Sequence, residues 1–127
     1  MQEAVASKKT LVLGASLKPE RHSNMAVKRL RESGHPVLAL GGRPGQVEDV
    51  AIHKSIEDFE GEQVHTITLY MNDRRQQDYY DFIFSLQPER IIFNPGAENA
   101  ELYQQAKEKG ILAENACTLV KLAMHNY

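Results

Sequence analysis

The sequence contains a single cysteine and no long apolar run, and each shortage excludes a class of protein. One thiol, Cys117, cannot form an internal disulfide or a multi-cysteine metal site. No stretch approaches the roughly 20 apolar residues of a membrane-spanning helix, and residues 1–9 lack the apolar core of a signal peptide. The five histidines are not spaced as metal ligands. We therefore expect a cytoplasmic protein without a metal site and without a membrane partner.

What the sequence does contain is typical of one soluble domain. The chain has 127 residues, of which 42% are hydrophobic and 25% charged. This length suits a single hydrophobic core, and both fractions are ordinary for a globular protein. We predict one domain over residues 1–127, in which residues 1–8 form a flexible tail.

Positive charge is concentrated near the start of the chain, although the net charge is -2. Residues 1–43 hold eight lysines and arginines against three acidic residues, whereas residues 44–127 hold seven against fourteen. A local excess of this kind attracts a polyanionic small molecule, or it covers a solvated helix face. The acidic overall balance, with no basic stripe interleaved with aromatic residues, argues against nucleic acid as a partner.

Short apolar runs alternate with segments of helical spacing. The expected strands cover residues 10–13, 36–40, 64–71, 90–93 and 111–113, with room for a further short strand at 50–52. The expected helices cover residues 23–33, 73–86, 97–109 and 118–125. This alternation predicts an α/β fold, a three-layer doubly wound Rossmann-like parallel sheet of about five strands in the order 3-2-1-4-5. A ligand of such a sheet binds where the order reverses, which we expect between the first and fourth strands.

The stretch from Thr10 to Asn24 is a strand, a glycine turn and the start of a helix with Ser23 as its expected cap. Gly14 permits a sharp turn and a close ligand approach, and Ser16 offers a hydroxyl and an amide. Amides beside a positive helix end suit a phosphate. Only the first glycine of the G-x-G-x-x-G fingerprint is present, so a plain strand-to-helix turn remains an alternative.

Two cations and an amide follow this turn. Lys18 and Arg21 lie in the loop before the helix, where either could contact a phosphate, Arg21 through a bidentate fork. Solvent or Glu20 is the alternative partner for both. Asn24 could bond the ligand or help to cap the helix.

Two later positions also point to a nucleotide. Arg43 follows the second strand, where NAD-binding domains place a carboxylate for the ribose hydroxyls. An arginine there favours a phosphate on the ribose, as in NADP or coenzyme A, unless it is an ordinary surface residue of the turn. Tyr70 and Met71 end the third main strand, where they could sandwich an adenine or belong to the core.

No catalytic set is evident in the sequence. Cys117 has His125 eight residues away and no third partner, so we expect a buried, inert thiol. Ser16 is not embedded in a G-x-S-x-G elbow. Glu98 follows the Pro95-Gly96 turn near a helix start, and the helix dipole alone accounts for a carboxylate there.

Several blocks stand together along the chain: Gly14-Ala15-Ser16, Lys18-Pro19-Glu20-Arg21, Asn24, Gly42-Arg43-Pro44, Asn94-Pro95-Gly96-Ala97-Glu98-Asn99 and Glu114 to Val120. They resemble the small single-domain CoA-binding proteins, which are similar to the CoA-binding domain of the succinyl-CoA synthetase α-subunit. The likeness runs from about Lys9 to Met124. One departure is Gly41-Gly42, where such domains commonly have Asn-Pro before the arginine.

The resemblance implies a Rossmann-like domain that binds coenzyme A or an acyl-CoA. It places the pyrophosphate on Gly14, Ala15 and Ser16, and the charged phosphates at Lys18, Arg21 and Arg43, the last preceded by Gly42. The pantetheine side would be lined by Asn24 and the loop of Pro95, Gly96, Ala97, Glu98 and Asn99. The synthetase's catalytic histidine lies outside these blocks, so ligase activity is not implied.

We therefore expect non-catalytic binding of coenzyme A or an acyl-CoA by a stand-alone domain that is not itself an enzyme. One alternative is an NADP-binding oxidoreductase-type domain, which needs a proton donor and a substrate pocket. Another is a protein-interaction module with a vestigial nucleotide site. The sequence identifies no protein partner.

Overall fold

The computed structural model describes residues 7–127, which are built around one seven-stranded sheet. The strands are β1 (Thr10–Leu13), β2 (Val37–Leu40), β3 (Gly45–Val47), β4 (Val50–His53), β5 (Thr66–Leu69), β6 (Arg90–Phe93) and β7 (Leu112–Asn115). The helices are α1 (His22–Glu32), α2 (Asp73–Gln76), α3 (Tyr80–Ser85), α4 (Ala100–Glu108) and α5 (Thr118–Ala123), with 3-10 turns η1 (Ile56–Phe59) and η2 (Gln77–Tyr79). Of the expected tail, residues 1–6 lie outside the described residues.

The strand order is β3-β4-β2-β1-β5-β6-β7, which confirms the Rossmann-like α/β class but corrects the expected order and strand count. Neighbouring strands run parallel except for the β3–β4 pair. We expected the segment at 64–71 beside the second strand. Instead β5 pairs with β1 along its whole length, from Thr10↔Thr66 to Leu13↔Leu69. The order therefore reverses between β1 and β5.

The place beside β2 is taken by β4, which carries β3 as an antiparallel edge strand. The hydrophobic signal of this hairpin is weak, because its buried apolar residues are only Val47, Val50 and Ile52. Ile52 and His53 make the whole register with β2. The further short strand expected at 50–52 is present as β4. Such a short pairing depends on the neighbouring strand more than on its own sequence, which explains why the place of β4 beside β2 and its partner β3 were not predicted.

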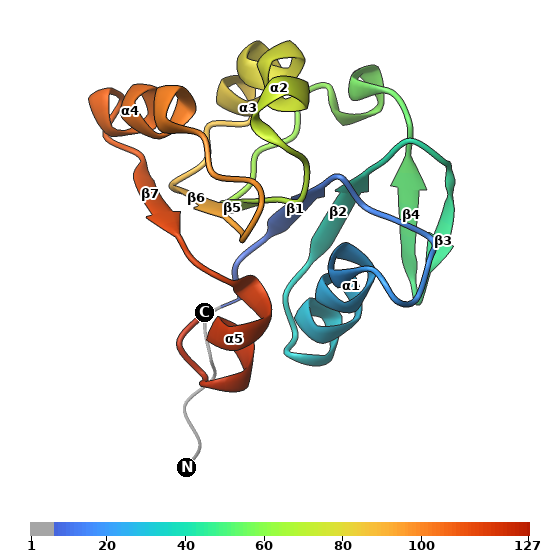
Figure 1. Cartoon of the computed structure of the whole chain (residues 1–127). Helices are drawn as coiled ribbons and strands as arrows, with labels where there is room; N and C mark the ends of the chain where they lie inside the picture. The colour runs from blue at the N-terminus through green and yellow to red at the C-terminus, as the bar shows by residue number, and fades with distance from the viewer. Residues whose placement is uncertain (1–6) are drawn as a thin grey trace.

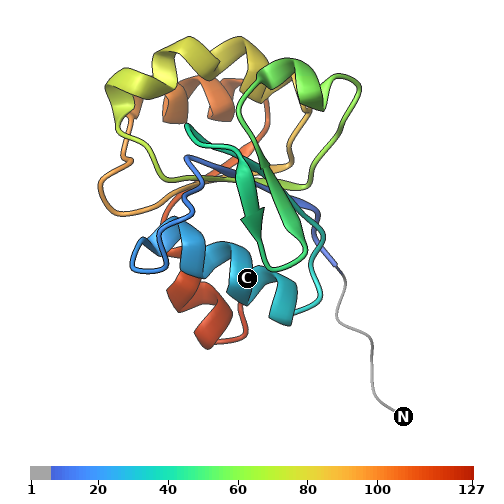
Figure 2. The ribbon, with the colours of Figure 1, turned by 90° about the vertical axis from the view of Figure 1, so that its right-hand side faces the viewer.

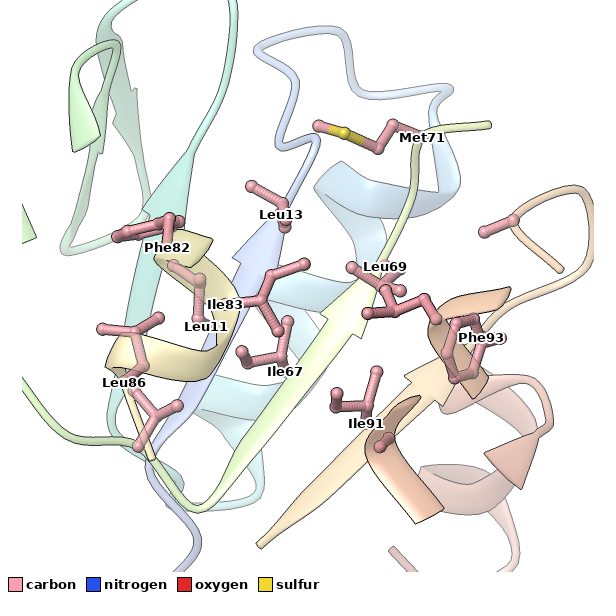
Figure 3. Packing of buried hydrophobic residues seen from close by; sticks show 14 of the residues in the cluster. Leu11, Leu13, Ile67, Leu69, Met71, Phe82, Ile83, Leu86, Ile91 and Phe93 are labelled. Carbon is pink, nitrogen blue, oxygen red and sulfur yellow. The ribbon is translucent and has the colours of Figure 1, made fainter. Parts of the chain in front are cut away.

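Helices cover both faces of the sheet (Figures 1 and 2). Helices α1 and α5 lie together on one face, and α2, α3 and α4 lie on the other. Because side chains alternate along a strand, β1 feeds two cores: Leu11 and Leu13 pack towards α3 (Figure 3), whereas Val12 packs with Val27 and Leu30 of α1. None of the described helices is long and apolar enough to cross a membrane.

Two of the expected helices differ from the observed ones. Helix α1 begins at His22 with Arg21 as its N-cap and no side-chain cap, so Ser23 lies buried inside the first turn. The helix expected over 73–86 is divided into α2, η2 and α3. Asn72 caps it, because its Oδ1 accepts the amide of Arg75 at 3.0 Å.

Candidate functional site

A cleft of about 720 Å³ lies beside the reversal point of the sheet. Its walls come from the loops that follow β1, β2, β5 and β6 and from the first turn of α1. In open α/β sheets this is the crevice in which ligands bind. We had expected the loop at Asn94 to Ala97 to meet the β1 turn at the reversal point. That place belongs to Tyr70, after β5, and Pro95 reaches the cleft from one strand further along.

The turn after β1 is held tightly to its neighbours. Gly14 has φ +98°, and a β-carbon there would lie 2.9 Å from the backbone carbon and oxygen of Tyr70. The amides of Gly14 and Ala15 both donate to the carbonyl oxygen of Leu40, at 2.9 Å each. The two amides that we expected to hold a pyrophosphate are therefore already used to join the turn to β2.

The amides that follow in the loop and in the first turn of α1 are not used in this way. Those of Ser16 and Leu17, and those of His22 and Ser23 in the first turn of α1, donate to no backbone acceptor within residues 7–127. No acidic residue lies in that first turn. The Asn24 side chain donates to the Ser16 carbonyl at 2.9 Å and so ties the loop to α1. The uncapped, positive end of α1 thus faces the cleft and favours an anion.

Cations surround this helix end. Lys18 and Arg21 precede α1, Arg43 follows β2, and Arg75 lies on α2. All four are exposed, and none forms an ion pair with an acidic side chain in the part of the chain that the structure describes. Glu20 is the only carboxylate among the described cleft residues. The cleft therefore carries a positive field that suits a polyanion.

The sequence profile of the CoA binding domain family matches residues 8–123. The chain belongs to this family. The crystal structure of an uncharacterized protein is 41% identical, with a TM-score of 0.90, and the match covers 97% of this chain and 100% of that one. No curated protein sequence matches.

More distant solved structures share the fold of this CoA-binding domain. A Thermus thermophilus protein is 21% identical with a TM-score of 0.82, over 95% of this chain and 91% of its own. A hypothetical protein from Pyrococcus horikoshii is 24% identical with a TM-score of 0.81, over 93% of this chain and 83% of its own. These likenesses support the arrangement of the sheet and helices.

The structure brings most of the predicted binding residues together in the cleft. Those after β1 are Gly14, Ala15, Ser16, Lys18 and Arg21. Those after the other strands are Gly42, Arg43, Tyr70 and Pro95. The cleft also contains residues that we did not predict, namely Leu17, Glu20, His22, Ser23 and Arg75. For Arg75 the sequence signal was a pair of arginines after the third main strand, which does not reveal which of the two faces a ligand.

The other predicted residues lie outside the cleft: Asn24, Met71, Gly96, Ala97, Glu98 and Asn99. Met71 is buried in the core with Leu13 and Leu69 (Figure 3). Glu98 accepts the amide of Gly96 at 2.9 Å, and Asn99 caps α4 by accepting the amide of Leu102 at 3.1 Å. Their polar groups are used within the fold.

Gln76, which sequence reasoning missed, connects several of these residues. Its side chain is fully buried, and Nε2 donates to the carbonyl oxygens of Met71 at 2.8 Å and Ala97 at 2.7 Å. Its Oε1 accepts from Nδ2 of Asn99 at 2.9 Å. These bonds join the loop after β5 to the loop after β6. They form a frame that holds Arg75 and Pro95 at the cleft.

Two chemically reactive groups are not exposed in the cleft. The Tyr70 hydroxyl is buried without a hydrogen-bond partner among residues 7–127, and burial raises the pKa of this phenol, so it stays protonated at neutral pH. Cys117 is half-buried and does not line the cleft. Within the described chain, no cluster of three or more histidine, cysteine or acidic residues could hold a metal ion.

Proposed function

We propose that this domain binds coenzyme A or an acyl-CoA in the cleft at the end of β1. The observation that carries the proposal is the uncapped N-terminus of α1 beside four unpaired cations of the described chain. Membership of the CoA-binding domain family supports the same ligand.

The cleft offers a partner for each charged part of the ligand. The amides of Ser16, Leu17 and His22 have no backbone acceptor within the described residues and are available to the diphosphate, which the helix dipole would stabilise further. Arg43 follows β2, on the side where a doubly wound fold places the ribose, and would bind the 3′-phosphate there. The small loop at Pro95 leaves room for the pantetheine arm.

We further propose that the domain binds its ligand in the cytoplasm without converting it. Of the two cleft serines, Ser16 accepts the amide of Lys18 at its Oγ at 3.1 Å, and within residues 7–127 neither Ser16 Oγ nor Ser23 Oγ is hydrogen-bonded to a base. The thiol of Cys117 lies outside the cleft. This arrangement supports a carrier or sensor of coenzyme A, because covalent catalysis needs a nucleophile held against its base.

Thermal unfolding in the presence of ligands tests the proposal. We expect coenzyme A and acetyl-CoA to raise Tm and NADP at the same concentration to leave it unchanged, because a ligand that binds only the folded state stabilises it. Ser16→Trp should remove the ligand-induced shift while the free protein still unfolds cooperatively. Acetyl-CoA recovered after incubation should be intact. A shift with NADP alone would favour the oxidoreductase-type alternative, and acetyl-CoA hydrolysis would show catalysis.

A further inference from the structure

We propose that Arg75 binds the diphosphate from the side opposite Arg43 and thereby fixes the direction in which coenzyme A lies. The inference rests on the proposed function. In this arrangement the 3′-phosphate lies at Arg43, and the phosphate next to pantetheine lies between the start of α1 and Arg75. The pantetheine arm then leaves the cleft past Tyr70 and Pro95.

The strand order places these two arginines on opposite flanks of the β1 turn. Arg43 follows β2 and Arg75 follows β5, and these are the two neighbours of β1 in the sheet. Adjacent strands lie about 4.8 Å apart, so a long side chain from either flank reaches a ligand seated on the turn. Coenzyme A carries two separate anionic groups on its ribose, the 3′-phosphate and the 5′-diphosphate. One arginine could not bind both at once.

The local structure places Arg75, and not the neighbouring Arg74, at the cleft. Asn72 Oδ1 accepts the amide of Arg75, and the next residue, Gln76, is locked in the buried frame. The guanidinium of Arg75 makes no hydrogen bond or ion pair within residues 7–127, so its five donors are open towards the cleft. Arg74 is exposed but does not line the cleft.

An arginine is suited to this position because its planar fork binds two phosphate oxygens at once. A lysine would supply the charge without the fork. An exposed arginine with a merely solvated side chain would contribute nothing to binding, so substitution separates the two possibilities.

The test compares two ligands by calorimetry: coenzyme A, and adenosine 3′,5′-bisphosphate, which lacks the second phosphate of the diphosphate and the pantetheine arm. We expect Arg75→Gln to weaken coenzyme A about tenfold, the loss of one charge-assisted interaction, and to leave the bisphosphate nearly unaffected. Arg75→Lys should restore part of the lost affinity. Arg43→Gln should weaken both ligands, and Arg74→Gln, the matched control, should weaken neither.

Each result has a distinct meaning. If the unaltered protein binds no coenzyme A, the proposed function fails and this inference fails with it. If it binds coenzyme A but Arg75→Gln loses no more affinity than Arg74→Gln, the role of Arg75 is refuted and the proposed function stands. Equal losses of both ligands in Arg75→Gln would place Arg75 at a phosphate that both ligands carry, on the adenosine side, and refute the stated direction. Tm values of the free variants confirm that they are folded.

Discussion

The carbonyl oxygen of Ala15 lies 2.2 Å from the position that a β-carbon on Gly41 would occupy. The turn after β1 and the end of β2 therefore touch through their backbones, and any side chain at Gly41 would force them apart. The amide of Gly41 also donates to the carbonyl oxygen of His53 in β4 at 2.9 Å. This contact explains sterically why a glycine stands at position 41. The neighbouring Gly42 has open space around its Cα.

Gly41→Ala should therefore lower the free energy of unfolding by about 2 kcal/mol or more, since the new methyl group must displace backbone. It should also weaken coenzyme A binding, because the turn after β1 moves. Gly42→Ala is the matched control and should change stability by no more than about 0.5 kcal/mol. Urea denaturation measures both. Equal stabilities for the two variants would show that the turn and β2 are not in contact.

Gln76→Leu should destabilise the domain by about 2 kcal/mol. The leucine fills a similar volume but leaves the carbonyl oxygens of Met71 and Ala97 without a donor. The exposed neighbour provides the control, and Gln77→Leu should leave the urea midpoint nearly unchanged. A Gln76→Leu variant as stable as the unaltered protein would mean that the two loops are not joined by this side chain.

Arg43→Ala should weaken coenzyme A about tenfold and dephospho-coenzyme A much less, because only the first carries the 3′-phosphate. Calorimetry at one ionic strength gives both affinities. The same fractional loss for the two ligands would assign Arg43 to another part of the ligand.

The stability of the domain should fall in mild acid because of His35. This side chain is buried, and burial lowers its pKa below the ordinary value of 6.5, with the nearby charges of Lys8 and Arg90 and the neighbouring His65 adding to the effect. Its Nδ1 accepts the amide of Lys8 at 2.9 Å, which requires that nitrogen to be unprotonated. The unfolded chain then binds a proton at a higher pH than the folded one. The stability that His35 contributes is therefore fully present above pH 6.5. It is lost as the pH falls below 6.5 and through the lower pKa of His35 in the folded state.

Urea denaturation at about pH 7.5 and about pH 5.5 brackets this transition. We expect His35→Asn, which keeps an acceptor for the Lys8 amide but cannot titrate, to show a smaller loss between the two conditions. His125→Asn is the control, since His125 is exposed and has a positive φ that asparagine adopts readily. If His35→Asn loses as much stability as the unaltered protein, another group causes the pH dependence.

The fold class and the position of the glycine turn after β1 were predictable because they depend on local patterns. Thr10–Leu13 and Arg90–Phe93 are short apolar runs that end at turns, and Gly14 has the positive φ that its place after a strand suggested. The place of β4 was not predictable, because only two of its residues pair with β2. Ser23 was expected as the cap of α1, but the helix begins one residue earlier, at His22, and Ser23 is buried in its first turn.

In the candidate site, too, some features could be predicted from local sequence and others could not. Sequence spacing located the loops but not the direction of individual side chains, so Met71 and Asn99 were expected at the ligand and lie instead in the supporting structure. Arg74 and Arg75 are adjacent and chemically identical, and only the folded backbone distinguishes them. Gln76 gave no signal, because a buried glutamine is recognised by its partners and not by its sequence context.

The carbonyl oxygen of Leu40 accepts hydrogen bonds from both Gly14 and Ala15, and this has a mechanical consequence. One carbonyl oxygen at the tip of β2 anchors both of the first amides after β1, so the turn after β1 and the end of β2 should move as one unit. Paired substitutions across this junction should consequently be non-additive.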